Sequence, residues 1–447
     1  MRGKNTDIIK NYKVSIILEK DVLLIKNCIW LYFWLLMFEG ALRKWVLPGL
    51  ATPLLIVRDP VAIFILFKSF SSRLIHGNLY IITGWLVSII CIPIAIFFGH
   101  GNVFVAIYGS RIFLIHFPMI FIIGTLFNSE DVIRIGKSFL ALVIPTTILI
   151  AVQFYSPQSA FVNRGVGGDE KGAGFSGALG FARPPGFYSF TNGNVTYYCI
   201  VICFIFYFWL SEFKQIKSYL LIFYTITFVI AFPMCISRTL FFQIALTLLF
   251  SLVAISSNKK IFGRLLFAIV VVGILVLIFQ NTSFFQTSVD AFSARFDNAN
   301  ESEGGIKGVF LDRVLGGLVS ALLFKENPIP YFGYGIGLGT NVGAMLTTGT
   351  TGFLISEGEW GRLVGEMGFV LGITIIILRT TLGFDLLIGA FKEISKRNLL
   401  PWILMSGTFM AILQGQFAQP TSLGFGVLMG GLVIASLKNS QSINNNK

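Results

Sequence analysis

The 447-residue chain is 55% hydrophobic and only 12% charged, with a formal net charge of +13 and a mean hydropathy of +0.79. Because a soluble domain carries about twice this share of charge, the composition excludes a soluble globular protein. It predicts an all-α, polytopic membrane protein in which the basic surplus contacts lipid phosphates, so we expect no nucleic-acid partner.

Apolar runs of about 17–25 residues are candidates for membrane-spanning helices. Residues 1–21 lack the short apolar core and cleavage site of a signal peptide, so the first apolar run is expected to remain as a membrane helix. The sequence predicts about twelve transmembrane helices in a single integral membrane domain over 1–447, near 22–38, 53–70, 79–98, 103–126, 138–155, 195–210, 218–236, 239–256, 265–279, 363–378, 400–415 and 423–437.

Basic residues gather on alternate connections between these helices. The basic connections contain Lys68/Arg73, Arg134/Lys137, Lys214/Lys217, Lys259/Lys260/Arg264 and Lys392/Lys396/Arg397. The short turns at 100–102 and 416–422 contain no Lys or Arg. Since Lys and Arg favour the cytoplasmic side, we expect an inner membrane protein with both termini in the cytoplasm.

Two long segments are then expected in the periplasm. The first, 156–194, is rich in glycine. The second, 280–362, contains a stretch at 309–324 that is too short and too close to charges for a span, and we predict an interfacial helix there.

Charged residues inside apolar spans are functional candidates by default. Arg238 joins two apolar helices with almost no loop, and the alternative role is contact with headgroup phosphates. Arg58 and Asp59 favour a structural ion pair. Arg111 is either paired with another helix or placed near a polar cavity.

The external segments contain further candidates. Arg183 lies beside two prolines and a glycine, which restrict its backbone. The glycines of 333–343 are not followed by the residues of a phosphate-binding loop, and a tight re-entrant turn is favoured. Glu359, Arg362 and Glu366 are spaced to share a helix face, so local ion pairing is the alternative to a functional role.

These motifs resemble those of the O-antigen polymerase and ligase family, multi-helix membrane glycosyltransferases of GT-C-like architecture. Ser237-Arg238-Thr239 is similar to the Ser-Arg motif of the family. The 183–186 and 191–194 stretches resemble its Arg-x-x-Gly and Asn-rich loop. The 327–337 stretch resembles its Pro/Gly motif, and Glu366-Met-Gly368 its Glu-x-Gly motif.

One position departs from the ligase pattern. Ligases have His-Asn nine residues ahead of the Glu-x-Gly glutamate, where this chain has Glu357 and Gly358. The difference favours a polymerase or a less-studied branch of the family, with a ligase as the alternative. The 38–45 segment is similar to uncharacterised members, and the sequence assigns it no role.

The resemblance implies transfer of a polyprenyl-diphosphate-linked glycan donor to a lipid-linked acceptor, with a chain-length regulator protein as a further partner. Arginine suits a diphosphate leaving group because its planar fork binds phosphate oxygens in pairs. The candidate diphosphate and sugar ligands are Arg183, Arg238, Arg362 and Trp360. Glu357, and after it Glu359, is the candidate base, and Arg238 also counts as catalytic. We expect no metal and no cofactor.

A flippase or transporter of lipid-linked glycans is the rival from another class, and a scaffold is a third. Twelve helices with both ends inside fit many carriers. Two-bundle carriers usually place their longest loop centrally and in the cytoplasm, whereas the long loops expected here are external. The loop positions therefore favour the glycosyltransferase.

Overall fold

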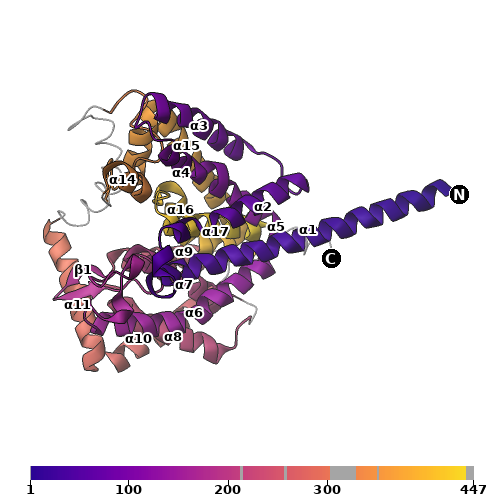
Figure 1. The fold of residues 1–447 in the computed structure, drawn as a ribbon. Helices are drawn as coiled ribbons and strands as arrows, with labels where there is room; N and C mark the ends of the chain where they lie inside the picture. Colours follow the sequence, from indigo (N-terminus) through magenta and orange to yellow (C-terminus); the bar gives the residue numbers. More distant parts are fainter. Residues whose placement is uncertain (1, 212–214, 256–258, 303–328, 350–351, 439–447) are drawn as a thin grey trace.

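The computed structural model describes residues 2–211, 215–255, 259–302, 329–349 and 352–438 (Figure 1). Helices dominate this part of the chain. They are α1 (Arg2–Ala41), α2 (Asp59–Ser71), α3 (Leu79–Phe97), α4 (Val103–Arg111), α5 (Phe117–Leu126), α6 (Ser129–Tyr155), α7 (Thr191–Leu210), α8 (Ser218–Met234), α9 (Arg238–Ile255), α10 (Lys259–Phe279), α11 (Ser283–Ser302), α14 (Asn341–Thr348), α15 (Glu359–Ile394), α16 (Leu400–Gln414) and α17 (Pro420–Leu437).

The expectation of a helical, multi-pass membrane protein is confirmed. Nine helices in the described ranges are long and apolar enough to cross a membrane, with α4 and α5 counted as one through a π-helical turn at Ile112–His116. The apolar helices α8 and α16 are shorter, and α2 has 13 residues. The total of twelve spans therefore stays a prediction. A small antiparallel hairpin, β1 (Phe175–Ala178) and β2 (Phe181–Arg183), interrupts the helical pattern.

Local signals explain where some helices begin and how they pack. The Asn128 side chain accepts from the Asp131 amide and Asp131 accepts from the Asn128 amide, a capping box that starts α6 at Ser129, earlier than the predicted 138. Glycines allow α5 and α17 to approach closely. A Cβ at Gly124 would lie 2.5 Å from the Ile434 side chain, and one at Gly431 would lie 2.6 Å from Ile123.

The bundle has two distinct ends. We call the end with the start of α1, the start of α6 and the end of α2 the terminal end. Two ion pairs tie it together, Lys26–Asp131 at 2.6 Å and Lys68–Asp21 at 2.8 Å. The opposite loop end carries the β1–β2 hairpin, α11 and α14, which lie at the left of Figure 1. The connections 42–58, 156–190, 235–237 and 415–419 all belong to the loop end.

Helix α15 is a helical hairpin rather than one straight rod. Gly368 has φ 73° and ψ 175°, so the chain reverses there between a short limb, 359–367, and a long limb, 369–394. The limbs pack tightly, since a Cβ at Gly372 would lie 2.7 Å from the Leu363 carbonyl oxygen. The predicted span at 363–378 is therefore corrected: the turn at Gly368 divides it, and the short limb folds back beside the long one.

The second long loop contains a helix that the sequence analysis missed. The apolar side chains Phe285, Val289, Phe292 and Phe296 of α11 recur at helical spacing and form one face. This periodicity is readable in the sequence. The predicted helix at 309–324 lies outside the described residues.

Reporter fusions would test the orientation of these two ends. A phosphatase fused at Gly172 or Gly349 is expected to be active and a fluorescent protein silent, because both sites are at the loop end, which the charge bias predicts to lie outside the cytoplasm. A fusion after Ser72, at the terminal end of α2, is the internal control and should give the reverse pattern. An active fluorescent protein at Gly172 would contradict the assigned orientation.

Candidate functional site

Arg183 is the last residue of the β1–β2 hairpin at the loop end. Its guanidinium carbon lies 4.7 Å from the centre of the Phe175 ring. The chain that follows is held by side chains from two helices. Asn194 donates to the Pro184 carbonyl at 3.2 Å, and Gln153 accepts from the Gly186 amide at 2.8 Å. The backbone beside Arg183 is therefore anchored, as the prolines and glycine of the sequence predict.

The Ser237–Arg238 turn meets this hairpin. Asn194, which holds Pro184, also lies 3.8 Å from the Cys235 sulfur. A Cβ at Gly177 of β1 would lie 2.9 Å from the Ile236 side chain. Arg238 follows as the first residue of α9 and is 8% exposed. Two motifs separated by about fifty residues in sequence thus become neighbours through direct contacts.

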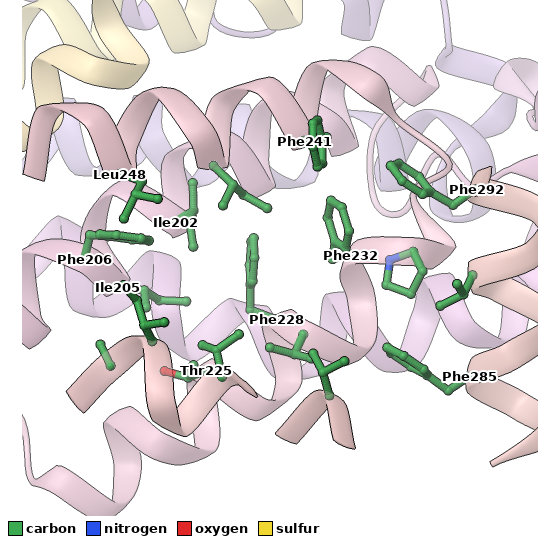
Figure 2. A pocket seen from close by; sticks show the side chains of 18 of the residues that line it. Ile202, Ile205, Phe206, Thr225, Phe228, Phe232, Phe241, Leu248, Phe285 and Phe292 are labelled. Carbon is green, nitrogen blue, oxygen red and sulfur yellow. The ribbon is translucent and has the colours of Figure 1, made fainter. Parts of the chain in front are cut away.

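An apolar cavity of about 710 Å³ lies along α9 beyond this turn (Figure 2). Its volume is in the usual range of ligand sites, about 300–1,000 Å³. Phe232 and Phe241 line it near the turn, and Phe206 and Leu248 line it farther along. The cavity therefore runs along the helices, away from Arg238.

The two ends of the cavity differ in polarity. Gln286, Asp290 and Ser293 of α11 line it at the loop end, whereas Trp209 and Leu265 line it toward the terminal end. Helix α10, which forms one wall, has only 11% of its span buried and exposes Leu266, Phe267 and other apolar side chains. Such an apolar outer face suits contact with lipid.

The carboxylates of α15 form a buried cluster with two arginines. Arg362 donates to both oxygens of Glu359 at 2.9 Å and also to Glu366. Arg379, from the long limb, donates to Glu359 at 2.6 Å. All four side chains are at most 3% exposed. Two positive charges balance two negative charges, so the local ion pairing that the spacing allowed is confirmed and extended across the hairpin.

Glu357 lies outside this cluster. It precedes the short limb and is exposed, and its backbone carbonyl accepts from the Gln416 side chain at 2.7 Å. Trp360 is half-buried, and its indole donates to the Leu413 carbonyl at 2.9 Å. Of the two candidate bases, Glu357 is thus accessible from the loop end. Glu359 is instead buried and paired with Arg362, which is itself a candidate substrate ligand.

The glycines of 333–343 wrap the turn of the α15 hairpin. The Tyr334 amide donates to the Gly365 carbonyl at 2.7 Å and the Gly335 amide to the Glu366 carbonyl at 3.0 Å. Gly333 has φ 75° and Gly335 has φ 106°, values that favour glycine. This loop satisfies the last carbonyls of the short limb, which explains the glycine spacing without a nucleotide.

A second buried charge cluster joins helices α1, α2 and the α4–α5 unit. Arg58 donates to Glu39 at 3.1 Å, and Arg111 donates to Asp59 at 2.6 and 2.8 Å. Of the two alternatives that the sequence left open for Arg111, pairing with another helix is the one observed. The expected ion pair between the neighbours Arg58 and Asp59 is replaced by partners on other elements. His116 completes the cluster, 2.9 Å from Asp59, and its inclusion was not predicted.

The described residues contain no group of three or more His, Cys, Asp or Glu side chains suited to a metal ion. No family model, curated protein or solved structure matches the chain. Fold and site together define a polytopic α-helical membrane protein. Its loop end brings two arginine-bearing segments together next to helices that line an apolar cavity, and it places an exposed glutamate beside a buried charge cluster.

Proposed function

We propose that the protein is a membrane glycosyltransferase, similar to O-antigen polymerases, that joins polyprenyl-diphosphate-linked oligosaccharide repeats on the periplasmic side of the bacterial inner membrane. The observation that carries this proposal is the meeting of the Arg183 hairpin with the Ser237–Arg238 turn, which joins α8 and α9, two of the helices that line the cavity. A diphosphate joined to a long hydrocarbon chain needs positively charged side chains for its phosphates and an apolar cavity for its chain.

The arginines would bind the diphosphate leaving group. When the glycosidic bond of the donor breaks, negative charge develops on the phosphate oxygen that had been joined to the sugar. A guanidinium remains charged even when buried and donates two parallel hydrogen bonds to phosphate. Preorganised donors of this kind stabilise the transition state because they do not need to reorganise during the reaction.

The cavity would receive the hydrocarbon chain of the carrier. Each buried methylene contributes about 0.8 kcal/mol to binding, so a few isoprene units would hold the substrate firmly. The aromatic and aliphatic lining offers no hydrogen-bond partners to a sugar along most of its length. The glycan would remain outside, at the loop end, near the exposed Glu357.

Glu357 would act as the base. A hydroxyl of the acceptor sugar attacks the anomeric carbon of the donor, the bond between that carbon and the phosphate oxygen breaks, and the hydroxyl proton passes to the Glu357 carboxylate. The diphosphate leaves on its carrier lipid. Each step uses side chains of this protein, without a metal or a cofactor.

Reconstitution would test this function. Purified protein in vesicles with a polyprenyl-diphosphate-linked repeat unit should yield a ladder of longer glycans on gels. Transfer of a preformed polymer to a lipid acceptor, without a ladder, would favour the ligase alternative. Movement of the lipid-linked repeat across the bilayer without bond formation would favour a flippase and reject the proposal.

Filling the cavity should weaken donor binding. Ile244→Trp is expected to raise the KM for the lipid-linked donor about tenfold with little change in kcat, because loss of about two buried methylenes costs about 1.6 kcal/mol in both the ground and transition states. The matched control is Leu249→Trp, on the same helix but 57% exposed outside the cavity. Equal KM values for the two variants, measured by donor titration, would show that the cavity does not bind the donor lipid.

A further inference from the structure

The 39–45 segment, which we call the clamp segment, lies where α1 ends at the loop end. It is packed against the chain that follows Arg183. A Cβ at Gly40 would lie 2.3 Å from the Ser189 backbone nitrogen, so this approach requires glycine. The helix then widens into a π-helical turn at Leu42–Val46. Such turns are frequently found at functional sites.

The clamp segment holds the chain after Arg183 by two side chains. The Lys44 ammonium donates to the Gly186 carbonyl at 2.6 Å, and Arg43 donates to the Ser189 hydroxyl at 3.1 Å. Lys44 is 1% exposed, and its nitrogen lies 4.2 Å from the centre of the Trp45 ring. Burying an ammonium is costly unless it is well bonded. Its bond to Gly186 is therefore a firm restraint on the arginine loop.

The same segment is joined to the opposite half of the site. Glu39 accepts from Arg58 at 3.1 Å, and Arg58 donates to the Pro420 carbonyl at 2.6 Å. Pro420 begins α17 at the end of the turn that also contains Gln416. Gln416 in turn donates to the Glu357 carbonyl at 2.7 Å. A continuous path of hydrogen bonds and short chain segments thus links the Arg183 loop with the Glu357 backbone.

We propose that the clamp segment positions the Arg183 loop relative to Glu357, and that Lys44 is the positioning residue on the arginine side. This inference rests on the proposed glycosyltransferase function only for its catalytic consequence. The physical reason is distance: the donor phosphate and the acceptor base must be held at one separation for in-line attack. A misplacement of about 1 Å can lower a rate about 100-fold.

Hydrogen–deuterium exchange on full-length protein in nanodiscs tests the clamp without any substrate. Lys44→Met keeps the length of the side chain and removes the bond to Gly186. The peptide 181–190, which contains the Gly186 and Tyr188 amides, should exchange about tenfold faster while peptides of α16 and α17 stay unchanged. The control is Lys26→Met on the same helix, which loses the Asp131 pair and a contact with the Phe127 ring, both at the terminal end.

Ser189→Ala is a milder second variant. It removes the Arg43 bond on the loop itself and should give a smaller increase in the exchange rate of the same peptide.

In the transferase assay, Lys44→Met should lower kcat about 10- to 100-fold with KM changed less than about threefold. Unchanged exchange at 181–190 in both variants would overturn the proposal that the clamp segment positions the Arg183 loop. Faster exchange with normal kcat would overturn its catalytic consequence. If the variants exchanged faster but the wild-type protein had no transferase activity, the positioning role of the clamp segment would hold and the proposed function would be rejected.

Discussion

Arg238→Lys and Arg183→Lys are each expected to lower glycan transfer by about 100-fold or more, with protein levels unchanged. Lysine keeps the positive charge but replaces two parallel donors with a single point charge, and it cannot match the paired oxygens of a diphosphate. Loss of one preorganised donor to a developing oxyanion typically costs about 100- to 1,000-fold in kcat. The effect should therefore appear in kcat.

Glycan chain length in cells and kcat in vesicles would measure this effect. Arg164→Lys provides the matched control, because Arg164 lies in the same long loop and pairs at 3.0 Å with Glu170, which is exposed. Because Glu170 is open to solvent and Arg164 is half-exposed, this pair contributes at most about 1 kcal/mol, and the control should behave as wild type. Near-normal chain length in both Arg183→Lys and Arg238→Lys would show that charge alone suffices, as for anchoring to headgroups.

Glu357→Gln and Glu359→Gln should fail in different ways. Glutamine at 357 retains size but cannot accept a proton, so kcat should fall by about 100- to 10,000-fold while thermal stability is unchanged. Glutamine at 359 removes one of the two negative charges that balance Arg362 and Arg379 in a buried cluster. Breaking a buried pair costs about 3–5 kcal/mol, so this variant should unfold at a lower temperature.

Two measurements separate these outcomes: unfolding monitored by tryptophan fluorescence in detergent, and single-turnover transfer in vesicles. Glu170→Gln removes an exposed carboxylate and serves as the common control. If the Glu359→Gln protein were stable but slow in the chemical step, Glu359 rather than Glu357 would be the base. Full activity in Glu357→Gln would mean that the acceptor hydroxyl needs no base from this position.

The helices themselves were readable from the sequence because each depends on short-range properties. Apolar runs of spanning length predicted the order of the helices, and the pairing of Glu359 with Arg362 followed from their spacing of three residues. Helix α11 was also encoded locally, by apolar residues at helical spacing, although this signal was overlooked. Such features need no knowledge of distant parts of the chain.

Contacts between distant segments were decided only by the tertiary structure. The sequence indicated Glu359 as a second candidate base and Arg362 as a substrate ligand at a helix entrance, but the reversal at Gly368 brings Arg379 to Glu359 and buries the group. It likewise left the 38–45 segment without a role, because the partners of Lys44 and Glu39 lie at Gly186 and Arg58. A buried charge takes whichever opposite charge or carbonyl the packed helices place beside it. That choice depends on which helices become neighbours, a property that no local pattern of residues contains.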